Sequence, residues 1–502
     1  MKKKTYITVG FSLLLSSVTL SIFSFRCNTP LIDNRSNVIL INADDLGAHH
    51  LGIYGQKVIK TPRIDQMARE GVLFKNGYSS ATTCGPSRVA LLLGKHVGHL
   101  PWTQRKNGGL CRVYRDQVAF PELLSDNGYH TAMFGKHHNA IMAADRTPVG
   151  DLPSDCGFDL SIGTFWAMAA HQLYLDGVTA PQQNYSKHLW KDDKGIVSPY
   201  PIKPNRYTHN EYIDLALSYI EEKRDAPFFL YLPFQIPHWE IAVPRQGDAD
   251  HRPEDMGLLE QYLKEDGTSI FKETPYNGSA LFQRKILEPA ATHAAMVSRL
   301  DRDVGLILDK LIEKGLDKNT LVIFTSDNGR VGTPGGDHFD MSKLVKGGKA
   351  SLYEGGIKVP FIFWGGNVEN NLIIEEPIVM HDLAPTLLSV ADTDTPFTTD
   401  GKNWKDIVLS QDNSEIDSFK RPLYWENFHG HGCQAALLEY RYKVIKSKCD
   451  QQDYKIEVYD LTKDPIESND LSAQADMKPI IEKAKQLFIS EHIPFQESGI
   501  LF

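Results

Sequence analysis

Three short, continuous runs of apolar residues mark this chain, at residues 37–43, 227–233 and 320–326. Runs without alternation are typical of strands that are buried on both faces of a sheet. Between them, residues 207–224 and 291–315 repeat apolar side chains at the spacing of a helix, and the second segment ends at a glycine. Because strands and helices alternate, the pattern predicts an α/β fold with a mostly parallel sheet.

Two long segments interrupt this alternation. Residues 140–206 are rich in His, Tyr, Trp, Pro and Asn, residues 240–285 are polar, and neither segment shows a clear period. Irregular segments of this kind are typical of surface loops, which often carry binding residues. We therefore interpret both as insertions that shape a pocket above the sheet.

The C-terminal part has a different pattern. Short strand candidates lie at residues 423–426 and 442–445, and a helix is predicted near residues 477–489. We interpret residues 36–390 as the main α/β domain and residues 391–502 as a smaller α+β subdomain.

The first 30 residues have the pattern of a secretory leader. Three lysines follow Met1, and an apolar stretch extends from about residue 6 to residue 25. Basic residues before a short apolar run are typical of a signal peptide, although this run is nearly long enough for a retained membrane anchor. We exclude residues 1–30 from the fold and expect an exported protein, periplasmic or extracellular, with the anchored form left open.

The charge balance excludes one broad class of function. The chain has 54 basic and 63 acidic residues, a net charge of −9, which argues against a general nucleic-acid binder. A local cluster of Lys, Arg and His can still make one cleft positive for an anionic substrate. No obligatory protein partner is indicated.

The cysteines set only a loose constraint. With Cys27 in the leader and Cys84 set aside for chemistry, the remaining four are Cys111, Cys156, Cys433 and Cys449. Four cysteines allow three pairings, and in an oxidising compartment a bond between the last two would close a hairpin-sized loop.

Two polar pairs follow two of the apolar runs directly. Asp44 and Asp45 come after the first run, and Asp327 and Asn328 come after the last. The carboxyl ends of the strands are where open α/β sheets bind ligands. Four oxygen donors suit a hard cation such as Ca²⁺ or Mg²⁺. Either pair alone is commoner as a turn, but together with Cys84 the two pairs favour a metal site.

The segment Cys84-Gly85-Pro86-Ser87-Arg88, followed by an apolar run that closes on Gly94-Lys95, is the most specific motif of the chain. A lone cysteine beside a proline turn is more often a buried free thiol. This segment, however, resembles the signature of type I sulfatases, in which the cysteine is oxidised to Cα-formylglycine. Other segments resemble further motifs of that family, at residues 42–47, 128–138, 237–238, 325–329, 348–356 and 459–465.

The resemblance covers nearly all of residues 36–465 and implies an alkaline-phosphatase-like sheet sandwiched by helices. It implies that Cys84, as the formylglycine hydrate, is the nucleophile: one hydroxyl attacks sulfur and the other later expels sulfate. It also implies that Asp44, Asp45, Asp327 and Asn328 hold Ca²⁺, less expectedly Mg²⁺, together with an oxygen of the modified Cys84.

The resemblance further implies roles for five basic residues. Arg88 would orient the hydrate with its planar fork of donors. Lys136 would stabilise the nucleophile or grip a sulfate oxygen, and His138 would take the proton of the spare hydroxyl. His238 and Lys349 would bracket the leaving side, one protonating the departing oxygen and the other binding sulfate.

Three residues depart from the family's usual pattern: Leu93, His137 and Arg330. Leu93 bears on how well a formylglycine-generating maturase, the one protein partner implied, reads the site. His137 leaves open which of two adjacent histidines faces the sulfate.

The expected substrate is a sulfated carbohydrate, with sulfated galactose or N-acetylgalactosamine as the predicted unit. Residues with aromatic, amide or basic groups in the irregular segments are candidates for sugar contacts: His171, Tyr174, Asn184, Lys187, His188, His429 and His431. Two alternatives are a formylglycine-dependent phosphonate monoester or phosphodiester hydrolase and an inactive glycan-binding homologue. Retention of every presumed catalytic group argues against the second.

Overall fold

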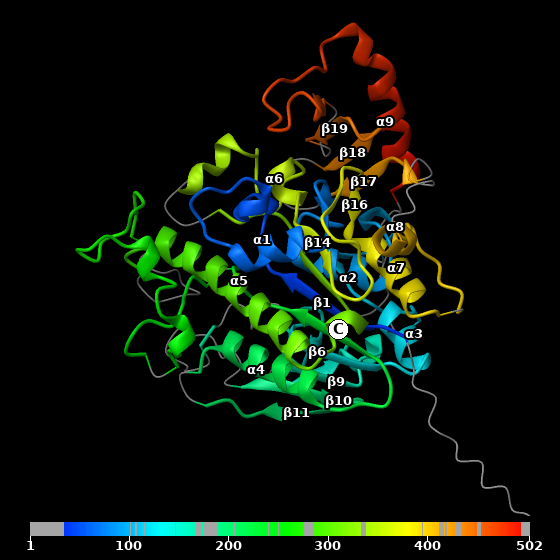
Figure 1. Ribbon diagram of the computed structural model, residues 1–502. Helices are drawn as coiled ribbons and strands as arrows, with labels where there is room; N and C mark the ends of the chain where they lie inside the picture. Colours follow the sequence, from blue (N-terminus) through cyan, green and yellow to red (C-terminus); the bar gives the residue numbers. More distant parts are fainter. Residues whose placement is uncertain are drawn as a thin grey trace, which may run out of the picture. The chain divides into compact units, whose positions relative to one another are not determined.

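In the computed structural model, the three apolar runs form the middle of a ten-stranded sheet. Strand β1 (Asn37–Ala43) pairs in parallel with β12 (Phe228–Pro233) on one side and β13 (Thr320–Ser326) on the other. All residues of these strands are buried. The predicted α/β sheet is therefore confirmed at its centre (Figure 1).

The structure describes residues 35–492 except 101, 106–107, 115, 146, 167–172, 175–187, 204–205, 239, 249, 276–285, 333–337, 394, 411–415, 417–418, 428–432 and 449–452. The predicted leader at residues 1–30 lies outside these. Across the described residues, we find no helix with the length and apolar character needed to cross a membrane.

The sheet is parallel in its middle, has antiparallel pairs on both flanks, and ends on one side in the parallel pair of β2 and β15. Its order is β11-β10-β9-β6-β12-β1-β13-β14-β2-β15, and the five strands from β9 to β13 in this order run parallel. The remaining strands are β6 (His130–Lys136), β9 (Leu160–Thr164), β10 (Leu189–Asp193), β11 (Ile196–Tyr200), β14 (Phe361–Trp364), β2 (Val72–Phe74) and β15 (Leu372–Ile374). Two-stranded pairs are formed by β3 (Gly77–Tyr78) with β16 (Ile378–Val379), β4 (Trp102–Arg105) with β5 (Gly108–Cys111), and β7 (Ile141–Met142) with β8 (Pro148–Gly150).

The segment 140–206 is more regular than its sequence indicated. It contributes β9, β10 and β11 to the large sheet, so its interpretation as a purely irregular insertion was wrong. The outer strands are only partly buried and carry polar residues such as Lys191 and Asp193, which broke the apolar pattern. For residues 240–285, the described positions form only short turns such as 253–255 and 260–262, as expected.

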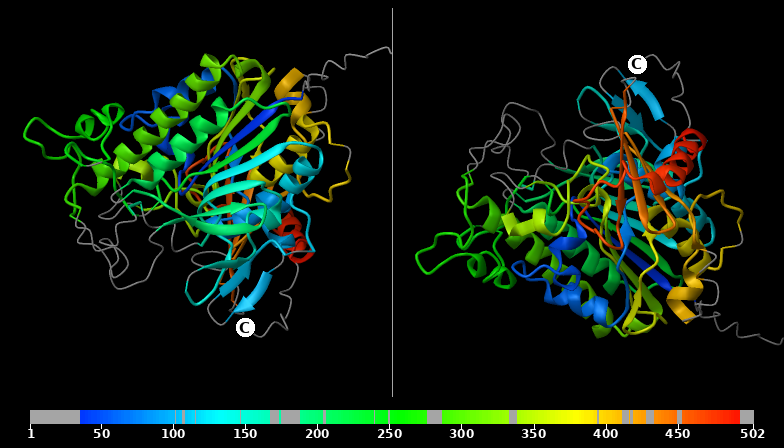
Figure 2. Two further views of the ribbon diagram at one scale, coloured as in Figure 1. Left: turned by 90° about the horizontal axis from the view of Figure 1, so that it is seen from below. Right: turned by 90° about the horizontal axis from the view of Figure 1, so that it is seen from above.

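Helices cover both faces of the large sheet (Figure 2). Residues of β1 alternate between two hydrophobic clusters: Ile39 and Ile41 pack on one face, Val38 and Leu40 on the other. The first face is covered by α1 (Pro62–Arg69), α4 (Thr208–Glu221) and α5 (Pro289–Glu313), and the second by α2 (Cys84–Leu93), α3 (Phe120–Asp126), α7 (Leu383–Val390) and α8 (Lys405–Ser410).

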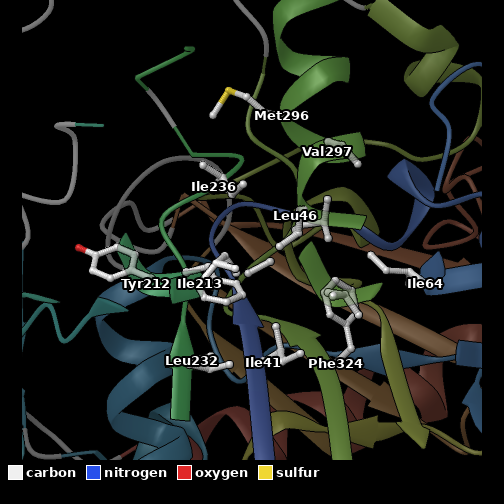
Figure 3. Packing of buried hydrophobic residues seen from close by; sticks show 14 of the residues in the cluster. Ile41, Leu46, Ile64, Tyr212, Ile213, Leu232, Ile236, Met296, Val297 and Phe324 are labelled. Atoms are coloured by element: carbon white, nitrogen blue, oxygen red, sulfur yellow. The ribbon is translucent and has the colours of Figure 1, made fainter. Parts of the chain in front are cut away.

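Figure 3 shows the packing on the first face. Ile41, Leu232 and Phe324 come from the three central strands, and Ile213 and Val297 come from helices α4 and α5. All five side chains are at most 1% exposed. Burial of this kind contributes about 1.5–3 kcal/mol of stability per large apolar side chain. The central strands, whose carboxyl ends carry the candidate site, are therefore held firmly in the core.

The C-terminal part contains a second, antiparallel sheet. Its strands are β17 (Leu423–Glu426), β18 (Gln434–Leu438), β19 (Tyr442–Ser447) and β20 (Lys455–Asp460), and helix α9 (Lys478–Ser490) packs on one face. The predicted strands and helix are confirmed. The other face packs against residues of the main part, including Tyr78 and Leu352, near the short helix α6 (Glu354–Ile357).

The cysteines divide into two groups. Cys84, Cys111 and Cys156 are free and buried. Cys433 is disulfide-bonded. Cys449, one of the partners that the sequence left open for it, lies outside the described residues, as does Cys27.

Candidate active site

The candidate residues meet at the carboxyl edge of the parallel strands. Because β1 and β13 pair from Asn37–Thr320 to Ala43–Ser326, the two polar pairs that follow them leave the sheet side by side. Helix α2 begins at the same place with Cys84. Potential ligand atoms of Asp44, Cys84 and Asp327 lie within 4.8 Å of one another.

Asp44 is neutralised by two cations that come from different elements. Lys136, the last residue of β6, forms an ion pair with Asp44 Oδ2. Arg88 Nη2 lies 3.6 Å from the same oxygen and 2.7 Å from Asp327 Oδ2. Arg88 also donates from Nε to Asp327 Oδ2 (2.9 Å) and from Nη1 to the carbonyl oxygen of Lys136 (3.0 Å). Since Arg88 follows Cys84 by four residues, both lie on one face of α2.

Asp45 has its own set of partners. Lys349 Nζ lies 2.7 Å from Asp45 Oδ1, and His238 Nε2 lies 3.3 Å from Oδ2. Lys349 Nζ and His238 Nε2 are 3.0 Å apart. Asn328 donates from Nδ2 to Asp45 Oδ1 at 2.7 Å. Asp45 has a φ of 64°, the left-handed region that Asp tolerates better than most residues.

The pKa values of the two buried carboxyls beside Cys84 are shifted in opposite directions. Burial alone would raise the pKa of Asp44, but Lys136, His238 and Arg88 hold it well below its ordinary value. Burial and the neighbouring Asp44 raise the pKa of Asp327 well above its ordinary value, against the influence of Arg88. Like charges this close favour one ionised member of the pair.

The cations stay charged despite burial. Burial would lower the pKa of Lys136, but Asp44 raises it above its ordinary value. The pKa of Lys349 is likewise raised, because Asp45 outweighs the effect of burial. The site therefore holds fixed positive charge in a largely buried region, where electrostatic interactions are strong.

The donor set fits a hard cation. Among the described residues, Asp44 Oδ1, Asp45 Oδ2 and Asn328 Oδ1 are buried and have no hydrogen-bond partner, and the nearby His238 Nε2 lies 3.3 Å from Asp45 Oδ2. Buried polar atoms normally have partners, so several lone acceptors at one point indicate a missing ligand. Carboxylate and amide oxygens are the ligands that Ca²⁺ and Mg²⁺ prefer.

The structure places the adjacent histidines in different environments. His137 Nε2 lies 2.8 Å from the carbonyl oxygen of Asp151, and burial lowers its pKa to about 4. His138 has a φ of 85°, and its Nε2 lies 2.8 Å from where a Cβ on Gly85 would be. Burial, reinforced by Lys136 and Arg88, lowers the pKa of His138 well below its ordinary value. A neutral His138 is therefore the histidine beside Cys84.

Sequence reasoning missed residues that hold this arrangement. Ser326 Oγ accepts a hydrogen bond from the backbone of Leu46 at 2.9 Å, and so ties the two strand-end turns together. Tyr231, buried in β12, accepts from Asn42 Nδ2 at 2.9 Å. A polar residue inside an otherwise apolar run is the signal that marks both Tyr231 and Asn42.

Few of the candidate sugar-contacting residues can be placed. Tyr174 is buried, and its ring packs at a tilt against Tyr207, 5.2 Å from centroid to centroid. The ring of His188 lies edge-on to Trp190 at 4.7 Å. The others lie outside the described residues: His171, Asn184, Lys187, His429 and His431.

A second cluster, unmarked by the sequence, lies elsewhere. Its members His96, His99 and Glu491 have ligand-type atoms close together. His96 Nδ1 accepts from the backbone of Gly98 at 3.1 Å, and Nε2 lies 3.0 Å from Glu491 Oε2. The proton of a neutral His96 is therefore on Nε2, which makes this contact a hydrogen bond to Glu491 rather than a free metal ligand.

Comparison with known proteins identifies the class. A family model described as Sulfatase matches residues 36–393, and one described as N-sulphoglucosamine sulphohydrolase, C-terminal, matches residues 348–492. The chain therefore belongs to the sulfatase family, and the protein is a sulfuric ester hydrolase.

Individual relatives are similar over most of their length. An arylsulfatase of Clostridium perfringens is 25% identical over 91% of this chain and 94% of its own. The structure of Ps i-CgsB in complex with k-i-k-neocarrahexaose has a TM-score of 0.69 and 24% identity, covering 93% of this chain and 95% of that one. The phosphonate monoester hydrolase of Agrobacterium radiobacter shares the fold, with a TM-score of 0.58 and 18% identity over 91% and 95% of the two chains.

Proposed function

We propose that this sulfatase removes sulfate from a sulfated carbohydrate, with formylglycine at position 84 as the nucleophile and Ca²⁺ as the cofactor. The observation that carries the proposal is the position of Cys84 at the start of α2. It lies among the buried cations Arg88 and Lys136 and beside Asp44, Asp45 and Asp327, which we call the acidic cluster. Sulfuryl transfer develops negative charge on oxygen, and cations fixed in advance around the reacting sulfur stabilise it.

Residue 84, as an aldehyde hydrate, supplies two hydroxyls on one carbon. One attacks sulfur and releases the sugar, and deprotonation of the other expels sulfate and restores the aldehyde. His138 is the base for the second step, because it is uncharged and packs against Gly85, next to the nucleophile. Arg88 orients the hydrate, and Lys136 stabilises its oxygen or a sulfate oxygen.

His238 and Lys349 act on the leaving side. One protonates the departing sugar oxygen and the other binds sulfate. Their 3.0 Å contact and their shared partner Asp45 support a joint role. A bound ester would replace the contact between them.

Asp44, Asp45, Asp327 and Asn328 would hold Ca²⁺ with an oxygen of residue 84. When bound, such an ion lowers the pKa of the attacking hydroxyl. Ca²⁺ is preferred to Mg²⁺ because several protein oxygens converge here, whereas Mg²⁺ usually keeps more of its waters.

The carbohydrate substrate is supported by the relative solved with k-i-k-neocarrahexaose. A sulfated galactose or N-acetylgalactosamine unit is our specific candidate. Of the described candidates for sugar contacts, His188 is partly buried, whereas Tyr174 is packed in the core. The N-terminal pattern supports export to the periplasm or the extracellular space, and a maturase must oxidise Cys84 first. The division at about residue 390 between a catalytic domain and a C-terminal subdomain is part of the same proposal.

The test is sulfate release from a panel of defined sulfated mono- and disaccharides, with mass spectrometry of the peptide that contains Cys84. We expect release from at least one galactose-type sulfate and a mass that shows formylglycine. Unmodified cysteine in an active preparation would contradict the mechanism. Faster cleavage of a phenyl phosphonate ester than of 4-nitrophenyl sulfate would favour the phosphonate hydrolase instead.

A further inference from the structure

The segment that carries Lys349 is a closed loop. The backbone of Gly355 donates to the carbonyl oxygen of Lys346 at 2.8 Å, which joins the ends of residues 346–355. At the tip, the backbone of Lys349 donates to Arg330 O at 2.7 Å, and that of Ala350 donates to Thr82 O at 2.9 Å. The loop is therefore attached on one side to the turn after β13 and to the approach to Cys84.

The other side of this loop is held by the C-terminal sheet. Asn427, which directly follows β17, donates from Nδ2 to Ala350 O at 2.7 Å. The bond reaches the residue next to Lys349, and Ala350 has a φ of 64°. A residue with a Cβ is costly in the left-handed region and stays there only if its surroundings hold it.

A buried charge cluster anchors the base of the loop to the same sheet. Lys443 of β19 is 1% exposed, and its Nζ lies 2.9 Å from Glu354 Oε1 and 2.9 Å from Glu467 Oε1. Glu467 Oε2 accepts a hydrogen bond from the backbone of Glu354 at 2.8 Å. Lys346 Nζ, at the start of the loop, donates to Glu467 O at 3.2 Å and to Tyr459 Oη at 3.0 Å.

These contacts matter because a lysine side chain is long and flexible. The place of its ammonium group depends on where its backbone is held. Lys349 must bring Nζ to 2.7 Å from Asp45 and 3.0 Å from His238, whereas Arg88 and Lys136 extend from a helix and a strand of the core. Lys349 is thus the one of these three cations whose backbone lies outside the core elements.

We propose that the C-terminal sheet positions Lys349, and that Asn427 and Lys443 are positioning residues for sulfate-ester cleavage. This inference rests on the proposed function of Lys349 on the leaving side. The sheet acts through the loop at residues 346–355 and touches neither the nucleophile nor the acidic cluster in this role.

The test compares leaving groups. In fully converted, Ca²⁺-loaded enzyme, kcat/KM is measured for a series of aryl sulfates whose phenols differ in pKa. Lys349 either assists the leaving oxygen itself or contacts His238, which then does so, and its displacement weakens that assistance in both cases. Rates should therefore depend more steeply on the phenol pKa. For Asn427→Ala we expect kcat/KM to fall by about 10-fold to 100-fold with the poorest leaving group and much less with the best, since small misplacements have effects of this size.

Matched variants distinguish an effect on the position of Lys349 from a general weakening of the C-terminal sheet. Gln434→Ala removes another amide-to-carbonyl bond of the same sheet, to Phe488 O at 2.9 Å on the α9 side, and should leave the slope unchanged. Lys443→Met should steepen the slope, and Lys443→Arg should restore it in part. The double variant Lys349→Ala/Asn427→Ala should be no slower than Lys349→Ala, because both changes remove the same function, that of the Lys349 ammonium group.

Each outcome bears on a different claim. A uniform loss across all leaving groups for Asn427→Ala, or an additive double variant, would overturn the positioning role. If Lys443→Met does not fold, the comparison of Asn427→Ala with Gln434→Ala still decides. A converted wild type that cleaves no aryl sulfate would contradict the proposed function, whereas an active wild type with an unaffected Asn427→Ala contradicts this inference alone.

Discussion

The two sides of the acidic cluster are built differently. Arg88 and Lys136, beside Asp44 and Asp327, have side chains that are 2% and 1% exposed. Lys349, beside Asp45, is 21% exposed. The charges next to Cys84 are thus fixed by core elements, whereas the charge next to Asp45 lies on a loop and is partly exposed. We therefore expect the cations beside Cys84 to keep their places when a substrate binds, and we expect the substrate to enter on the Asp45 side.

The strongest test of the nucleophile side is removal of Cys84. Cys84→Ala should lower sulfate release on the order of 10⁴-fold or more, because no other group can form the covalent intermediate. The measurement is initial rate with 4-nitrophenyl sulfate. Cys156→Ala, at another free and buried cysteine, is the matched control and should retain activity. Substantial turnover by Cys84→Ala would show that residue 84 is not the nucleophile.

Removal of the cation should affect both sides together. Chelation should abolish most activity reversibly, and Ca²⁺ at 100 times its Kd should raise the free energy of unfolding by about 2.7 kcal/mol. Differential scanning calorimetry with and without Ca²⁺ measures the second effect. In Asp45→Asn the stabilisation should shrink, whereas the exposed Asp309→Asn should keep it. Equal stabilisation of wild type and Asp45→Asn would place the ion elsewhere.

Neutralising one cation on each side compares the two sides directly. Lys136→Met should lower kcat about 10²-fold to 10³-fold, the usual range for a fixed charge at the reacting atoms. It should also destabilise the protein by about 3–5 kcal/mol without metal, because Asp44 then lies buried with one partner fewer. Lys349→Met should have smaller effects on both quantities, measured by kinetics and urea unfolding. A larger loss of stability for Lys349→Met than for Lys136→Met would show that the charge beside Asp45, and not the charge beside Asp44, is the more firmly fixed one.

The smallest expected effect is at Gly85. A Cβ there would lie 2.8 Å from His138 Nε2, so Gly85→Ala should displace the ring and slow sulfate release. We expect kcat to fall about 10-fold, within the usual contribution of a positioned base. Stability should not fall in parallel, since Ala favours a helix over Gly by about 1 kcal/mol. An unchanged kcat at full conversion of Cys84 would argue against His138 as the base.

Burial explains which parts of the fold were predictable. The run at 37–43 coincides with β1 and the run at 320–326 with β13, because these strands are buried on both faces and contain almost only apolar residues. Strands β10 and β11 escaped notice because they lie at the edge, are partly exposed and include Lys191 and Pro199.

The candidate site divides in the same way. Asp44 and Asp327 were found because each directly follows an apolar run, and their closeness follows from strand pairing alone. His138 contacts Gly85, which lies 53 positions earlier in the chain. Asn427 bonds to Ala350 in the loop of Lys349, 77 positions earlier. Such contacts depend on how whole elements pack, and no local pattern encodes them.

The balance of charge within the cluster has a consequence for the order of assembly. Arg88, Lys136 and Lys349 face Asp44, Asp45 and Asp327, and the pKa of Asp327 is raised, so the polypeptide carries enough positive charge for its ionised carboxylates before any metal arrives. We therefore expect it to fold without Ca²⁺. A divalent ion bound by the acidic residues would release both lysines towards an incoming anion and leave the site with an excess of positive charge. Metal and anionic ester should then each strengthen the binding of the other, by the same factor.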